Sequence, residues 1–111
     1  MKKSKRAGFL AALKAADLNT QALCRYVQRA MPRFRKRGTH LLTVTGVPSL
    51  EVGRAACQLL MRHVGCYDAF AHFVSENVLH ITVHLKRKMP KNPERWIKSR
   101  MTFKPQIKES A

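Results

Sequence analysis

The stretch over residues 40–86 constrains the fold of this chain most, because strand-like and helix-like patterns alternate within it. The run over residues 40–47 is rich in β-branched residues, and Pro48 closes it, as expected for a strand. Ser49 is a suitable N-cap for a following helix, and Gly65 is a suitable stop. This half of the unit predicts a strand followed by an amphipathic helix.

A hairpin is predicted after the helix. Two strand-like runs, Tyr67 to Ser75 and Val78 to Lys86, flank a turn at Glu76-Asn77, where asparagine tolerates a positive φ angle. A two-residue loop would place on the core face Phe70, His72, Val74, Leu79, Ile81, Val83 and Leu85. The opposite face would carry Phe73, His80, Thr82 and His84. That face suits stacking of an aromatic ring on a base, and the alternatives are packing against a helix or simple exposure.

Charge is distributed very unevenly around this unit. Of the net charge of +16, residues 1–39 contribute +10, from eleven Lys/Arg and one acid. Residues 86–111 contribute +7, from nine Lys/Arg and two acids. The intervening residues hold two Arg and three acids, a net charge of −1. A neutral core between basic flanks is typical of a small domain that binds a polyanion. The alternative is a soluble domain with solvated tails, but such tails usually mix both signs.

The helix expected before residue 40 carries two faces. Asn19 or Thr20 can cap it, Pro32 should kink or end it, and one apolar stripe is formed by Leu23, Val27, Ala30 or Met31, and Phe34. The spacing of four, four and three residues places on one ridge Arg25, Arg29, Arg33 and Lys36. No acid lies at i+4 from these arginines, so the ridge repels itself unless an outside anion neutralises it. Phosphate contact is therefore predicted, with a solvated helix face as the alternative.

Both termini are interpreted as basic extensions. Residues 1–18 are Ala-rich, helix-prone and acid-free up to Asp17, which is typical of a mitochondrial targeting segment, here retained as an anchor. Residues 87–111 have no core of their own, and Asn92 before a proline predicts a short helix over Arg95 to Met101. Trp96 and Phe103 are interpreted as anchors on a neighbouring protein or on RNA bases.

Several functional classes are excluded by what the sequence lacks. No run approaches the roughly 20 apolar residues of a membrane span. The chain has three cysteines, Cys24, Cys57 and Cys66, and no two of them are closely spaced. This argues against a disulfide scaffold and indicates a reducing compartment, with the cysteines packed as small apolar residues. Cys57, His63 and Cys66 lack a fourth zinc ligand, while His80 and His84 would lie about 13 Å apart on one strand. Six scattered acids and no nucleotide or nucleophile motif argue against an enzyme, a cofactor or a small-molecule substrate.

The segment from Thr45 through Gly46, Pro48 and Ser49 to Gly53-Arg54-Ala55 carries a family resemblance. With the basic helix in front, residues 20–86 resemble Alba-type nucleic-acid-binding proteins and the C-terminal domain of bacterial translation initiation factor 3. The resemblance implies a β-α-β-α-β-β plan, although Gly8 to Leu13 is a poor candidate for its initial strand. In size, basic arms and aromatic tail, the chain also looks like an organellar ribosomal protein.

The sequence therefore predicts a single α+β domain over residues 19–86, a β-α-β-β core preceded by a basic helix, between extensions over residues 1–18 and 87–111. The predicted function is a structural, non-enzymatic RNA-binding component of a mitochondrial ribosome, located in the matrix and contacting rRNA and neighbouring ribosomal proteins, without membrane contact. Alternatives are a free Alba-like DNA- or RNA-binding module, a subunit of an RNA-processing complex, or a small metal-dependent enzyme. The alternative location is the cytoplasm. The predicted RNA-binding residues are Lys2, Lys3, Lys5, Arg6, Arg25, Arg29, Arg33, Arg35, Lys36, Arg37, Lys86, Arg87, Lys88, Lys91, Arg95, Lys98 and Arg100.

Overall fold

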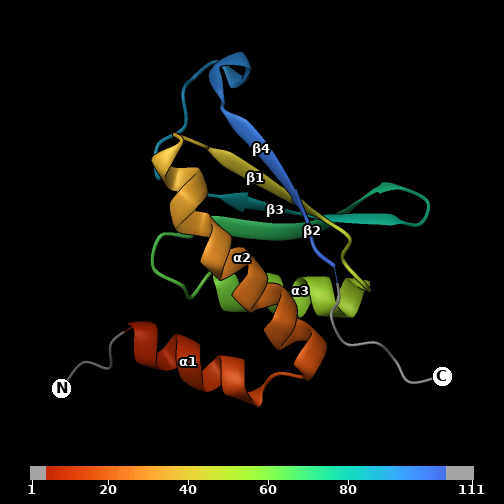
Figure 1. Cartoon of the computed structure of the whole chain (residues 1–111). Coiled ribbons are helices and arrows are strands. Elements are labelled where there is room, and N and C mark those ends of the chain that lie inside the picture. The colour runs from red at the N-terminus through yellow and green to blue at the C-terminus, as the bar shows by residue number, and fades with distance from the viewer. Residues whose placement is uncertain (1–4, 105–111) are drawn as a thin grey trace.

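Three α-helices lie on one side of a four-stranded sheet in residues 5–104, the part of the chain that this computed structural model describes (Figure 1). The elements follow in the order α1 Lys5–Ala15, α2 Leu18–Lys36, β1 Leu41–Thr45, α3 Leu50–Leu60, β2 Asp68–Ser75, β3 Val78–His84, a 3-10 turn at Pro93–Arg95, and β4 Lys98–Thr102. Helices α2 and α3 form the layer next to the sheet, and α1 packs on their far side (Figure 1). The predicted α+β class is confirmed.

The sheet has the strand order β2-β3-β1-β4. Strand β3 runs antiparallel to both β1 and β2, whereas β4 runs parallel to β1. The β-α-β-β order predicted for residues 40–86 is confirmed by β1, α3, β2 and β3. The sequence did not predict β4, which lies in the segment interpreted as an extension.

The prediction of a helix over Arg95 to Met101 is wrong. The Asn92 side chain does cap a turn by accepting a backbone N–H at 3.0 Å, but the turn ends after Pro93–Arg95. Ile97 then leaves the helical path, because its N–H donates to Nδ1 of His40 and its carbonyl accepts the His40 N–H at 2.8 Å. The following residues pair with the open edge of β1, where backbone hydrogen bonds are available that a one-turn helix would not supply.

The hairpin between β2 and β3 contains a register shift. Ser75 pairs with Val78 across the predicted two-residue turn, but Phe73 then pairs with Leu79, so Val74 is an extra residue on β2. A β-bulge of this kind reverses the alternation of every residue beyond it, because side chains on a strand alternate with a period of two.

The predicted faces of β2 are therefore exchanged. Phe70 and His72 lie on the face away from the helices, opposite Thr82 and His80, so their prediction as core residues is wrong. Val74 is exposed, and Phe73 is on the helix side although it is also exposed. The prediction for β3 is correct, with a buried core face of Leu79, Ile81 and Val83, continued by Leu85, and an opposite face of His80, Thr82 and His84.

The core lies between the sheet and the helices, and both predicted extensions contribute to it. Phe9 and Leu13 of α1 are buried, as are Met101 of β4 and Phe103 just after it. Gly53 of α3 allows close packing on the sheet, since a Cβ there would lie 3.3 Å from Ala71 and 3.1 Å from a Val47 methyl group. Among the described residues, no helix is long and apolar enough to cross a membrane.

The ends of the helices differ in part from the prediction. Ser49 caps α3 as predicted, because its Oγ accepts the Val52 N–H at 3.2 Å. Helix α3 ends at Leu60, however, and Gly65 with φ of +93° turns the loop that follows. Helix α2 begins at Leu18 with Asp17 as its N-cap, so neither Asn19 nor Thr20 caps it, and Thr20 is buried within the helix.

Candidate nucleic-acid interface

The basic ridge of α2 is continuous, because the helix does not end at Pro32. Pro32 is exposed inside the helix, and four further residues complete it to Lys36. The predicted apolar stripe is buried against the core: Leu23, Val27, Ala30, Met31 and Phe34. The cations beside it are exposed to solvent: Arg25, Arg29, Arg33 and Lys36. We call these four residues the α2 ridge.

The α2 ridge has no neutralising partner on its own helix. The 19 residues of α2 contain no Asp or Glu, and the helix C-terminus adds the exposed Arg37. Arg33 and Arg37 both lie beside the Phe34 ring, with guanidinium carbons 5.0 and 5.6 Å from the ring centroid. Such cation–π contacts hold the two guanidinium groups near the helix end without removing their charge.

Arg35 differs from its neighbours. It is half-buried, and its guanidinium group packs against Gly65 in the loop after α3, where any Cβ would collide with it. Its Nε is enclosed, with no hydrogen-bond partner among the described residues. The structure therefore places Arg35 between α2 and this loop rather than on the α2 ridge.

The remaining predicted cations occupy three places. Exposed in the connection between β3 and β4 are Arg87, Lys88, Lys91 and Arg95, while Lys86 is half-buried. Lys98 and Arg100 are exposed on β4. Lys5 and Arg6 belong to the first turn of α1, and Lys2 and Lys3 lie outside the described residues.

The two aromatic residues predicted as anchors contact their own domain. Trp96 is half-buried, and its Nε1 donates to the Pro90 carbonyl at 2.9 Å within the same connection. Phe103 is only 5% exposed, and its ring lies 5.4 Å from that of Tyr26 on α2. The Tyr26 hydroxyl donates to the Thr102 carbonyl at 2.6 Å, which ties α2 to the end of β4.

The face of the sheet away from the helices gathers a second set of polar and aromatic side chains. Strand register places on it Leu41, Thr43, Thr45, Asp68, Phe70, His72, His80, Thr82, His84, Lys98, Arg100 and Thr102. We call this the outer sheet face. The prediction missed Phe70 and His72 here because no residue pattern marks the bulge at Val74, and it missed the neighbourhood of Lys98 and Arg100 because β4 was not expected.

Ring contacts connect the centre of the outer sheet face. Phe70 lies 5.4 Å from His72 and 6.0 Å from His84 between ring centroids, and His72 lies 6.2 Å from His80. His72 Nε2 and the Thr82 hydroxyl are 2.9 Å apart, which fixes the imidazole. Burial lowers the pKa of His80, and the nearby Arg100 and His72 lower it further, so His80 favours the neutral form.

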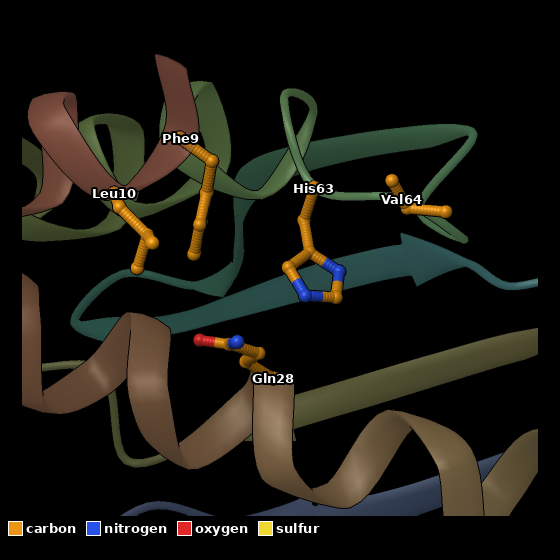
Figure 2. Close-up of a pocket in the computed structure, with 5 residues that line it drawn as sticks. All are labelled: Phe9, Leu10, Gln28, His63 and Val64. Carbon is orange, nitrogen blue, oxygen red and sulfur yellow. The ribbon is translucent and has the colours of Figure 1, made fainter. Parts of the chain in front are cut away.

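A pocket of about 440 Å³ lies elsewhere, between α1, α2 and the loop after α3 (Figure 2). Its lining consists of Phe9, Leu10, Gln28, His63 and Val64, and the His63 ring packs edge-on against Phe9 at 4.9 Å. The lining is mostly apolar, with Gln28 and His63 as its polar side chains.

Two of the three thiols have strongly raised pKa values. Cys24 and Cys57 are buried, and burial together with the nearby Cys66 raises the pKa of each to about 12. A thiol with such a pKa is protonated at neutral pH and is a poor nucleophile. Within the described residues, no group of three His, Cys, Asp or Glu is arranged to hold a metal ion.

Comparison with protein-family models, curated proteins and solved structures finds no match for this chain.

Proposed function

We propose that this protein binds RNA through phosphate contacts of the α2 ridge and serves as a structural component of a ribonucleoprotein particle. The observation that carries the proposal is a line of exposed cations along a 19-residue helix that contains no acid. An RNA backbone supplies the missing anions, and contact releases the counterions condensed on its phosphates. The apolar stripe on the other side of α2 fixes the helix on the domain, so the ridge is held in place before binding.

The particle we propose is the mitochondrial ribosome, with rRNA and neighbouring ribosomal proteins as partners in the matrix. The net charge of +16 on 111 residues and the targeting-like composition of residues 1–18 support this assignment. Burial of Phe9 and Leu13 supports retention of this segment, because its removal would expose the α2–α3 layer. Structural binding of this kind requires no catalytic group.

A free Alba-like module is the second candidate, and β4 favours it. In a β-α-β unit the first strand runs parallel to the second, so a strand preceding α2 would lie parallel to β1. Strand β4 pairs with β1 in that orientation, from Leu41 opposite Lys98 to Thr45 opposite Thr102. A parallel strand beside β1 is what this plan requires of its first strand, and here β4 from the C-terminal part of the described chain supplies one, which supports the proposal.

RNA binding is tested with the full-length protein and a labelled RNA over a range of salt concentrations. Replacing Arg25, Arg29 and Arg33 by Gln should weaken binding and reduce the slope of log affinity against log salt by about 2, from roughly 0.7 per lost phosphate contact. The matched control replaces three exposed cations elsewhere by Gln: Lys14, Arg54 and Arg62. Equal slopes for the two variants would show that net charge, and not the α2 ridge, governs binding.

Membership of a particle is tested by sedimentation of a mitochondrial extract. The protein should travel with a ribosomal subunit and move to light fractions after ribonuclease treatment. A protein that stays in light fractions without ribonuclease, yet binds RNA when purified, would instead support the free module.

A further inference from the structure

We propose that the outer sheet face binds single-stranded RNA, with a base stacked on Phe70 and the backbone phosphates neutralised by Lys98 and Arg100. This site is separate from the α2 ridge, and the inference rests on the proposed RNA-binding function. It adds a substrate class, because an exposed ring can read only bases that are not already paired and stacked in a duplex.

Phe70 is held ready for stacking. It is 44% exposed, although it lies in the middle of β2 and opposite Thr82 of the central strand β3. His72 and His84 flank its ring at 5.4 and 6.0 Å, so the ring does not need to be ordered when a base arrives. Preorganisation of this kind reduces the entropic cost of binding.

A largely buried histidine, His80, lies on the same face as Phe70. His80 is only 9% exposed although the described helices lie on the other face of the sheet, and its ring lies 6.2 Å from that of His72. Because its pKa is lowered, His80 presents a neutral imidazole beside the His72 ring. A flat base can therefore lie on Phe70 and His72 without contacting a charged imidazole at His80.

Charge on this face selects an anionic partner. Lys98 and Arg100 are exposed on β4, three strand spacings or about 14 Å from Phe70 on β2. The strand register places one acid on this face, Asp68, which lies two residues before Phe70 on β2 and opposite His84; its carboxylate accepts the Ala69 N–H at 2.9 Å. Aromatic rings at one edge and cations at the other match the bases and phosphates of one extended strand.

The same strand supplies a matched control. Phe73 is also an exposed phenylalanine of β2, with 54% of its surface accessible, but it is paired with Leu79 on the helix side. The two residues are three positions apart on a regular stretch of β2, so their side chains lie on opposite faces of the sheet. Phe70→Ala and Phe73→Ala therefore remove the same atoms from the same strand on opposite faces.

The test measures fluorescence anisotropy of an unstructured RNA oligonucleotide, a duplex of equal length, and an abasic oligonucleotide. Phe70→Ala should weaken binding of the unstructured RNA by roughly 5- to 150-fold, the range expected for one stacked base. It should leave duplex and abasic binding within twofold, and Phe73→Ala should leave all three within twofold. Arg100→Gln should weaken binding of both the unstructured and the abasic oligonucleotide.

The outcomes separate the two proposals. If the full-length protein binds RNA but Phe70→Ala behaves like Phe73→Ala, the outer sheet face does not bind single strands, while the α2 ridge still accounts for RNA binding. If the unaltered protein binds none of the three oligonucleotides, the proposed function itself is refuted. Thermal melting of each variant shows that the comparison uses folded protein.

Discussion

The segment after residue 90 gives the sharpest test of the fold, because the sequence predicts an anchor for partners there and the structure buries its phenylalanine. Phe103 is 5% exposed, its ring packs on Tyr26 at 5.4 Å, and its N–H donates to the Thr45 carbonyl at 2.8 Å. Phe103→Ala keeps the backbone bond but removes a buried ring. Burial of this extent and the lost ring pair predict a decrease of about 3–4 kcal/mol in the free energy of unfolding.

The assay is urea denaturation of the full-length protein without RNA. With a slope of about 1.5 kcal/mol per molar urea, the expected loss moves the midpoint down by roughly 2 M, a large part of the stability of a small domain. Ile97→Ala is the control, because Ile97 lies in the same segment but is 47% exposed, and it should cost less than about 1 kcal/mol. A midpoint unchanged by Phe103→Ala would refute packing of this segment on the domain and restore the anchor hypothesis.

Three further changes test other parts of the structure. Val27→Asp places a carboxylate at a fully buried position of α2 and should cost more than about 3 kcal/mol; an unchanged thermal midpoint would contradict the assignment of the apolar stripe. Since the pKa of His80 is lowered in the folded state, the unfolded chain binds the extra proton and stability should fall as pH drops below the ordinary value of about 6.5. His80→Gln should make this loss of stability smaller. If the urea midpoint shifts equally between pH 7.5 and pH 5 in the unaltered protein and in His80→Gln, His80 is not responsible for the pH dependence. Iodoacetamide at pH 8 should label Cys24 and Cys57 only after unfolding, because their pKa is about 12; rapid labelling of the native protein would disprove their burial.

Local signals predicted much of the fold because they depend on neighbours in sequence. Ser49 forms the expected cap, the turn at residues 76–77 pairs Ser75 with Val78, and Leu23 and Val27 are buried as their spacing requires. Each of these features is determined within a few residues of the chain, where helical periodicity and turn chemistry act directly.

The errors arose where distant segments decide the structure. The residues of β4 have no strong strand pattern, and their conformation is set by the free edge of β1 and by the bonds between Ile97 and His40. The bulge at Val74 arises in the pairing of β2 with β3, beside the turn, where no residue type marks it. The helical spacing of the cations predicted the exposed α2 ridge, whereas the bulge decides that Phe70, and not Phe73, joins the outer sheet face.

The pairing of β1 with β4 also sets a delay during synthesis. Thr45 and its partner Thr102 are 57 residues apart, so at roughly 5–20 residues per second β1 is made about 3 to 11 s before the strand that covers its edge. Through this interval the Leu-Leu-Thr-Val-Thr strand presents unpaired backbone groups, which favour association with other chains. We expect nascent chains stalled before residue 98 to depend on chaperones, and that dependence to end when β4 can dock.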